Sequence, residues 1–220
     1  FRLKRKIVFD SLAIGMSPFL MNLAACFIVI IINQGLKKYG GDLAIGAFGI
    51  VNRLVFIVVM IVMGLNQGMQ PIAGYNFGAK LYGRVNKVLR LTIIYATAVT
   101  TFGFLVGMLV PDLVVGIFTS DAELTELSVT GLRITVMFFP IIGFQMVTSN
   151  FFQSIGMAGK AIFLSLTRQM LILLPCLLVL PQFFGVAGVW YSMPVSDLLA
   201  SLIALVMLVC QFRKFRTSPL

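Results

Sequence analysis

The sequence predicts an all-α membrane protein that crosses the bilayer with six transmembrane helices. Of its 220 residues, 60% are hydrophobic and only 11% are charged, whereas soluble domains carry roughly 25% charged residues. The mean hydropathy is +1.04. Six apolar runs also reach the length of about 20 residues that a membrane helix needs. None of them shows the alternation of polar and apolar residues that is typical of outer-membrane strands.

Turn-forming or charged residues separate the six runs. The first two runs are joined through Gly40 and Gly41, a pair that predicts a tight turn. Ser120, followed three residues later by Glu123, fits a capping box and predicts that the fourth helix begins near Asp121. The predicted spans are Ser11 to Ile32, Leu43 to roughly Gly68, Leu91 to Val110, Leu127 to roughly Gln153, Ala161 to Leu180, and Val186 to Gln211.

Four of the spans contain a proline, which kinks a helix and frees a carbonyl one turn earlier. Membrane helices tolerate such breaks where neighbouring groups or a water-filled cavity satisfy the carbonyl. The pattern favours a transporter over a rigid anchor, although bending for helix packing alone would also explain it. The four residues are Pro18, Pro140, Pro175 and Pro194.

The positive charges lie at alternate ends of the spans. Twelve of the 17 Lys and Arg residues form four clusters there: Arg2, Lys4, Arg5 and Lys6; Lys80, Arg84, Lys87 and Arg90; Lys160; and Arg213, Lys214 and Arg216. The opposite ends hold Lys37, Lys38 and most of the acids. This is the positive-inside pattern, so we expect a multi-pass plasma-membrane protein with both termini in the cytoplasm.

The net charge of +10 therefore reports orientation in the membrane and does not indicate nucleic-acid binding. The charge pattern divides the chain into a cytoplasmic basic linker at residues 1–10, a six-helix transmembrane lobe at residues 11–212 and a cytoplasmic basic tail at residues 213–220. Because the chain begins with Phe1 instead of Met, we expect it to be a piece of a longer protein.

Ionisable residues within the spans are expensive in lipid and are candidate functional groups. Asp197 is the only acid among them, and the helical rise places it near the midplane together with Arg53 and Arg168. An ion pair of Asp197 with Arg168 or with Arg53 is therefore expected. Asp197 is either half of a structural pair or a carboxylate that takes up a proton during a transport cycle. Arg133 lies nearer the outer surface.

Polar uncharged residues within the spans either line a wet cavity or join helices by hydrogen bonds. Gln145, Ser149 and Gln153 follow a spacing of four residues, which places them on one helix face. The complete candidate set is Asn22, Asn66, Gln67, Gln70, Gln145, Ser149, Gln153 and Gln169. The chain has no His and its three Cys fall within spans, so neither a metal site nor a catalytic group is predicted.

Five motifs are informative in combination: "GLNQGMQPIAGYNFGAK", "GDLAIGAFGIVNR", "FFQSIGMAGKA", "SLTRQ" and "GVAGVWYSMPVSD". Together they resemble the MATE (multidrug and toxic compound extrusion) family of transporters, and the resemblance covers essentially the whole chain. It implies a two-lobe transporter of which this chain is the second, C-terminal, six-helix lobe. The missing N-terminal six-helix lobe would be its partner. The expected activity is export of small organic cations or drugs, driven by Na⁺ or H⁺.

The resemblance also assigns roles within the first motif. Pro71, Gly74 and Gly78 would form a helix break at the cytoplasmic gate, where Pro71 ends the second helix and the glycines allow close packing. The chain departs from one branch of the family, which places coupling carboxylates in the first and fourth helices of this lobe. Here those helices have no acid between Asp10 and Asp42, and none after Glu126. No coupling site is expected there, and no cofactor is implied.

Three other functions compete with the leading interpretation. The nearest is a lipid-linked oligosaccharide or polysaccharide flippase of the same superfamily. Such a protein favours a cationic cavity, and this chain offers only three arginines within its spans. A membrane enzyme would need clustered catalytic groups, which the sequence lacks. A non-transporting scaffold would not need polar faces and charges at the midplane.

Overall fold

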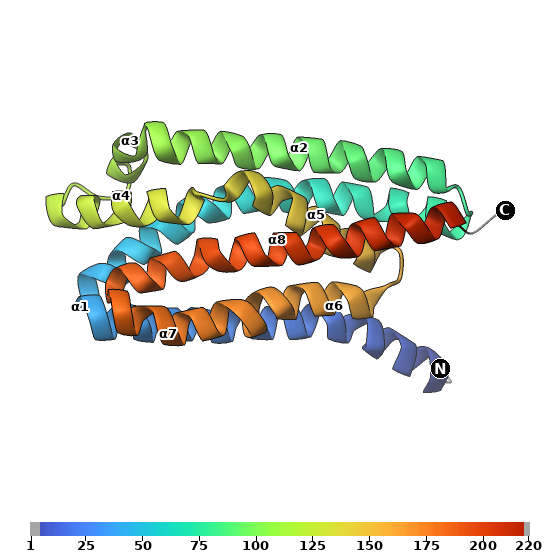
Figure 1. The fold of residues 1–220 in the computed structure, drawn as a ribbon, viewed down its shortest axis with the longest axis horizontal. Helices are drawn as coiled ribbons and strands as arrows, with labels where there is room; N and C mark the ends of the chain where they lie inside the picture. Colours follow the sequence, from blue (N-terminus) through green and yellow to red (C-terminus); the bar gives the residue numbers. More distant parts are fainter. Residues whose placement is uncertain (1–4, 218–220) are drawn as a thin grey trace.

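The computed structural model describes residues 5–217, apart from the side chains of residues 6–7, 9–15, 17–18 and 212–217. Over this range the fold is an antiparallel bundle of long helices (Figure 1). The elements are α1 (Arg5–Gly78), α2 (Tyr82–Leu109), α3 (Pro111–Gly116), α4 (Ala122–Val136), α5 (Phe139–Ser154), α6 (Ala158–Leu166), the π-helical segment η1 (Thr167–Leu173), α7 (Leu174–Phe184) and α8 (Val186–Thr217).

The element α1 consists of two membrane-crossing helices that meet at Gly41. This glycine has φ 68° and ψ −162°, outside the helical region, and only glycine adopts such a conformation without steric cost. In Figure 1 the chain folds back at this point, and the second half of α1 returns toward the end of the bundle at which the first half began. The predicted turn between the first two spans therefore lies at Gly41.

A break interrupts the fourth span, and a π-helical segment lies within the fifth. The axes of α4 and α5 differ by 55° across a break at residues 137–138, and Pro140 lies in the first turn of α5. In the fifth span the π-helical segment η1 lies between α6 and α7, and Pro175 lies in the first turn of α7. Pro194 lies inside α8, which continues through it.

The helices account for the six predicted crossings. Among the described residues, four helices are long and apolar enough to cross a membrane, and the bent pair α4–α5 makes a fifth. One of the four, Phe19–Gly78, contains the break at Gly41 and so supplies two crossings. The described parts of the first and last helices end on the same side of the bundle (Figure 1). The α1–α2 connection, which carries Lys80, and the α5–α6 connection, which directly precedes the first turn of α6 with Lys160, lie at this end too.

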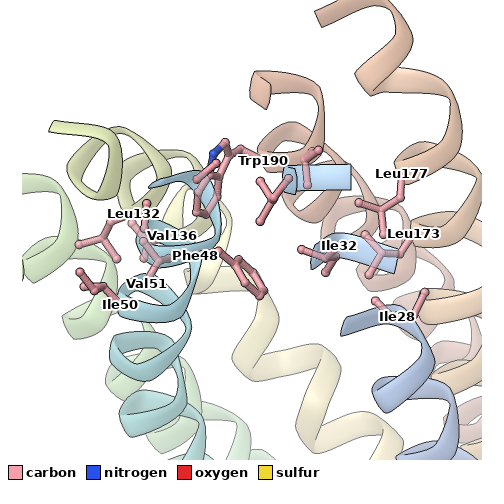
Figure 2. Close-up of a cluster of buried hydrophobic side chains, with 14 of the residues drawn as sticks. Ile28, Ile32, Phe48, Ile50, Val51, Leu132, Val136, Leu173, Leu177 and Trp190 are labelled. Atoms are coloured by element: carbon pink, nitrogen blue, oxygen red, sulfur yellow. The ribbon is translucent and has the colours of Figure 1, made fainter. Parts of the chain in front are cut away.

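Two hydrophobic clusters hold the bundle together. Around Trp190 of α8, side chains from both halves of α1, from α4 and from the fifth span meet (Figure 2). Trp190 packs on Phe48 with ring centroids 6.0 Å apart. A Cβ on Gly131 would lie 2.6 Å from the Trp190 ring, so only glycine fits beneath it. The second cluster joins the second half of α1 to α2, α5, α6 and α8 around Phe151 and Phe152.

One predicted helix boundary and one predicted cap were wrong, while the predicted start of the fourth helix near Asp121 was confirmed. Pro71 does not end the second span, because α1 continues as a helix to Gly78. A proline costs one hydrogen bond and bends the helix, and a membrane helix absorbs this without stopping. The cap of α4 is Asp121 and not Ser120, since the Asp121 carboxylate accepts a hydrogen bond of 3.0 Å from Leu124 N. The helices also reach into the ranges assigned to the linker and the tail, starting at Arg5 and ending at Thr217.

Candidate functional site

A pocket of about 230 Å³ lies within the bundle, where all six spans contribute to its wall. Most of its lining is apolar, from valine and isoleucine side chains of α1 to Phe139 of α5. Its polar lining consists of Asn52, Thr100, Thr135, Arg168, Ser196 and Asp197. The pocket therefore combines a largely dry wall with one charged pair and a few hydroxyl groups.

The charged pair joins the fifth span to the sixth. Arg168 of η1 donates a hydrogen bond from Nε to Oδ1 of Asp197 in α8 at 2.7 Å, and its Nη2 lies 2.6 Å from the same oxygen in a salt bridge. The side chain of Asp197 is only 6% exposed, whereas that of Arg168 keeps 31% of its surface exposed. It is the one salt bridge within the described part of the chain. Arg53, the other predicted partner, has an exposed side chain and makes no salt bridge to Asp197.

Three hydroxyl groups of the pocket use their protons within their own helices. Thr100 donates to the Ala96 carbonyl at 3.0 Å, and Thr135 donates to the Gly131 carbonyl at 2.8 Å. Ser196 donates to a carbonyl one turn earlier in α8 at 2.7 Å. A hydroxyl has one proton and two acceptor lone pairs, so these groups face the pocket as acceptors. A bound molecule would meet oxygen acceptors there, with Arg168 as the charged donor.

The predicted amide and serine residues lie elsewhere, because none of the eight lines this pocket. Gln145 is buried on α5, and Ser149 on the same face donates to the Ala161 carbonyl of α6 at 3.5 Å. Ser149, Gln153 and Gln169 are half-buried, whereas Asn22, Gln67 and Gln70 are exposed. The predicted role of this set, either in lining a wet cavity or in joining helices, stays a prediction.

Asn66 is buried in the second half of α1 with neither polar atom of its amide hydrogen-bonded. Thr167 Oγ1 and Gln169 Oε1 are also buried without a partner, and they lie on either side of Arg168 in the chain. An unsatisfied buried group costs about 1–3 kcal/mol. In the observed arrangement, the segment that carries Arg168 therefore leaves two buried polar side-chain atoms without a hydrogen bond.

Of the two glycines predicted to allow close packing at the gate, Gly74 does so at the basic end of the bundle, whereas a Cβ on Gly78 would meet nothing within 4 Å, so the prediction for Gly78 was wrong. A Cβ on Gly74 would lie 2.9 Å from the Ser154 carbonyl oxygen, so this glycine allows α1 to approach the end of α5. Gly78 is the last residue of α1. Nearby, Lys160 donates to Gln211 of α8 and lies over the Phe152 ring, with its Nζ 5.3 Å from the ring centroid. This end of the lobe is closed by contacts among α1, α5, α6 and α8.

The uncharged polar residues of the pocket, Asn52, Thr100, Thr135 and Ser196, were not predicted from the sequence. Thr100, Thr135 and Ser196 are small hydroxyl residues in apolar helices, where bonding to the preceding turn is the usual arrangement. Nothing in their spacing sets them apart from other such residues. The only available signal was that Ser196 directly precedes Asp197.

Comparisons with known proteins agree on one family. The model of the family MatE matches residues 16–178. "Multidrug export protein MepA" of Staphylococcus aureus (strain MSSA476) is 27% identical over 201 residues, which are 91% of this chain and 44% of that protein. The protein of the same name from Staphylococcus saprophyticus is 24% identical over the same share of each chain. This chain spans about half the length of the curated relatives that it matches.

Solved structures show the same relation. A ligand complex of a protein described as "MATE multidrug transporter DinF-BH" is 34% identical and superposes with a TM-score of 0.86. The match covers 99% of this chain and 49% of that one. A transporter described as the "Outward-facing conformation of a multidrug resistance MATE family transporter of the MOP superfamily" gives a TM-score of 0.90 at 19% identity, which shows a shared fold alone.

Proposed function

Because the chain belongs to the MatE family, we propose that it forms one six-helix half of a secondary active transporter that exports drugs or other organic cations. The observation that carries this proposal is the match of nearly the whole chain to about half of proteins named as multidrug exporters. A transport role also agrees with six crossings that bring the ends of the first and last helices to one side, and with a pocket inside the lobe. Transport needs no catalytic group, in line with our expectation that the protein is not an enzyme.

The coupling ion is proposed to be Na⁺ or H⁺. The first and fourth spans carry no acid within their apolar runs, so no coupling site is proposed there, and Asp197 of the sixth span is the one acid within the predicted spans. We place the basic end of the bundle in the cytoplasm, since lysine and arginine accumulate on that side of membrane helices. The proposed partners are a preceding six-helix lobe and the bilayer of the plasma membrane.

An efflux assay with ethidium, a fluorescent organic cation, tests the proposal. Cells that lack their own drug pumps would express either the chain alone or the chain joined at Phe1 to a six-helix MatE lobe. We expect the joined protein to lower the cellular content of ethidium, and the chain alone to leave it unchanged, because a cavity between lobes needs both. Export of ethidium by the chain alone would contradict the division into halves.

The flippase alternative is separated by a second readout. The same joined protein would be expressed in a strain deficient in a lipid-linked oligosaccharide flippase. Rescue of that strain without any ethidium export would replace the multidrug function with the flippase function. Export of ethidium that collapses when the Na⁺ and H⁺ gradients are dissipated would support the antiporter.

A further inference from the structure

The pocket around Asp197 holds a guanidinium group that belongs to the protein itself. From this geometry we infer that the pocket is a binding site for the guanidinium or ammonium head of a cation. In the observed state Arg168 occupies it as a tethered competitor. The inference rests on the proposed function for its role in transport, while the binding itself is testable without transport.

The size of the pocket favours a head group over a whole drug. Sites for drug-sized ligands measure roughly 300–1,000 Å³, and this pocket measures about 230 Å³. Its apolar wall includes Phe48 and Phe139, and aromatic faces attract cations. A small cationic group therefore fits the pocket, and the rest of a larger molecule would remain outside it.

The hydrogen-bonding capacity of the pocket also favours a cation. The hydroxyls of Thr100, Thr135 and Ser196 already donate to their own helices, so they can only accept from a ligand. Both measured contacts of Arg168 use the single oxygen Oδ1 of Asp197. A molecule that donates several N–H bonds would satisfy these acceptors, whereas an anion would face the Asp197 carboxylate.

The unequal burial of the two partners indicates which one leaves. Asp197 is 6% exposed and cannot lose its counter-charge without leaving a buried charge unpaired. Arg168 is 31% exposed and so keeps part of its side chain outside the protein interior. Replacement of Arg168 by another cation at Asp197 therefore separates the pair at the lowest cost in free energy, because the carboxylate keeps a counter-charge.

The local backbone supplies a second reason for Arg168 to move. It lies in the π-helical segment η1, a conformation that occurs frequently at functional sites. The neighbouring Thr167 Oγ1 and Gln169 Oε1 are buried without partners in this state. A shift of η1 that frees Arg168 would give these groups the opportunity to find partners.

The test measures binding to the purified full chain in lipid nanodiscs. The probe is methylguanidinium chloride, and the control at equal ionic strength is tetramethylammonium chloride, which has no N–H to donate. We expect methylguanidinium to raise the melting temperature of the wild-type chain saturably and the control salt to leave it unchanged. Arg168→Gln removes the competitor and should lower the apparent Kd for methylguanidinium at least about tenfold. This factor corresponds to a site that Arg168 occupies about nine-tenths of the time in the wild type.

Two further variants decide the outcome. Asp197→Asn should abolish the saturable shift of the melting temperature. Thr135→Val keeps both charges and should weaken binding of methylguanidinium by about three- to tenfold, so it provides a test if Asp197→Asn does not fold. Binding to Arg168→Gln but not to the wild type would show a fixed structural pair and overturn the inference. Equal binding to the wild type and Thr135→Val would also overturn it. Binding without any ethidium efflux by the joined protein would refute only the proposed function.

Discussion

Gly143 allows the closest approach between α2 and α5, and replacing it tests how tightly the bundle is packed. A Cβ at this position would lie 2.7 Å from Thr100 Oγ1 and 2.8 Å from the Ala96 carbonyl oxygen. Ordinary contacts are about 3.5–4.0 Å. The two helices would have to separate by roughly 1 Å, and overpacking of this kind costs about 1–3 kcal/mol. Since one contact is with backbone, we expect Gly143→Ala to lie at the upper end of this range.

The matched control is Gly68→Ala in the second half of α1. A Cβ at Gly68 meets nothing within 4 Å, and alanine favours a helix over glycine by about 1 kcal/mol. Reversible unfolding in mixed micelles, followed by circular dichroism, would give the free energy of each variant. Both glycines lie inside helices, so the helix preference of alanine cancels, and we expect Gly143→Ala to be less stable than Gly68→Ala by about 2–3 kcal/mol. Equal stabilities would refute the close packing of α2 on α5.

Three other predictions test topology, capping and the charged pair. In a background without the native cysteines, single cysteines that replace Tyr39 or Ser120 should react with a membrane-impermeant reagent from outside the cell. A cysteine that replaces Gly83 should react only from inside. Labelling of the Gly83 position from outside would show that the topology is the reverse. Asp121→Ala should cost about 0.5–2 kcal/mol, measured by the same unfolding assay, whereas Ser120→Ala should cost almost nothing because the Asp121 side chain caps α4. Asp197→Asn should lower the free energy of unfolding by up to about 3–5 kcal/mol, since it leaves Arg168 without its charge partner, and an unchanged stability would show that the pair contributes nothing.

The features that were predictable from the sequence depend on strong local signals. Long apolar runs and separated charge clusters suffice to predict the crossings and the common end of the termini, because a bilayer imposes helix length and charge placement. The turn at Gly41 was predictable from a glycine pair. The contact of Asp197 with Arg168 was one of two pairings that helix depth allowed, because a buried charge in lipid requires a partner.

The features that were not predictable depend on tertiary packing. Proline chemistry alone does not reveal whether Pro71 ends a helix or bends it, since that depends on the groups around the freed carbonyl. The π-helical turn at Thr167–Leu173 has no sequence pattern of its own. The pocket hydroxyls are identified only once Thr100 of α2, Thr135 of α4 and Ser196 of α8 are seen to line the same space.

The hydroxyl groups decide whether an entering cation can displace Arg168 from the pocket around Asp197. A ligand changes an equilibrium only by the difference in its affinity for the two states. A free guanidinium that merely reproduces the hydrogen bond and the salt-bridge contact of Arg168 with Asp197 gains little over a partner that is already tethered. The acceptors of Thr135 and Ser196 supply contacts that the tethered arginine does not make in this state. Selectivity for an entering cation should therefore lie in its additional N–H donors, and a quaternary ammonium should bind far more weakly than a primary one.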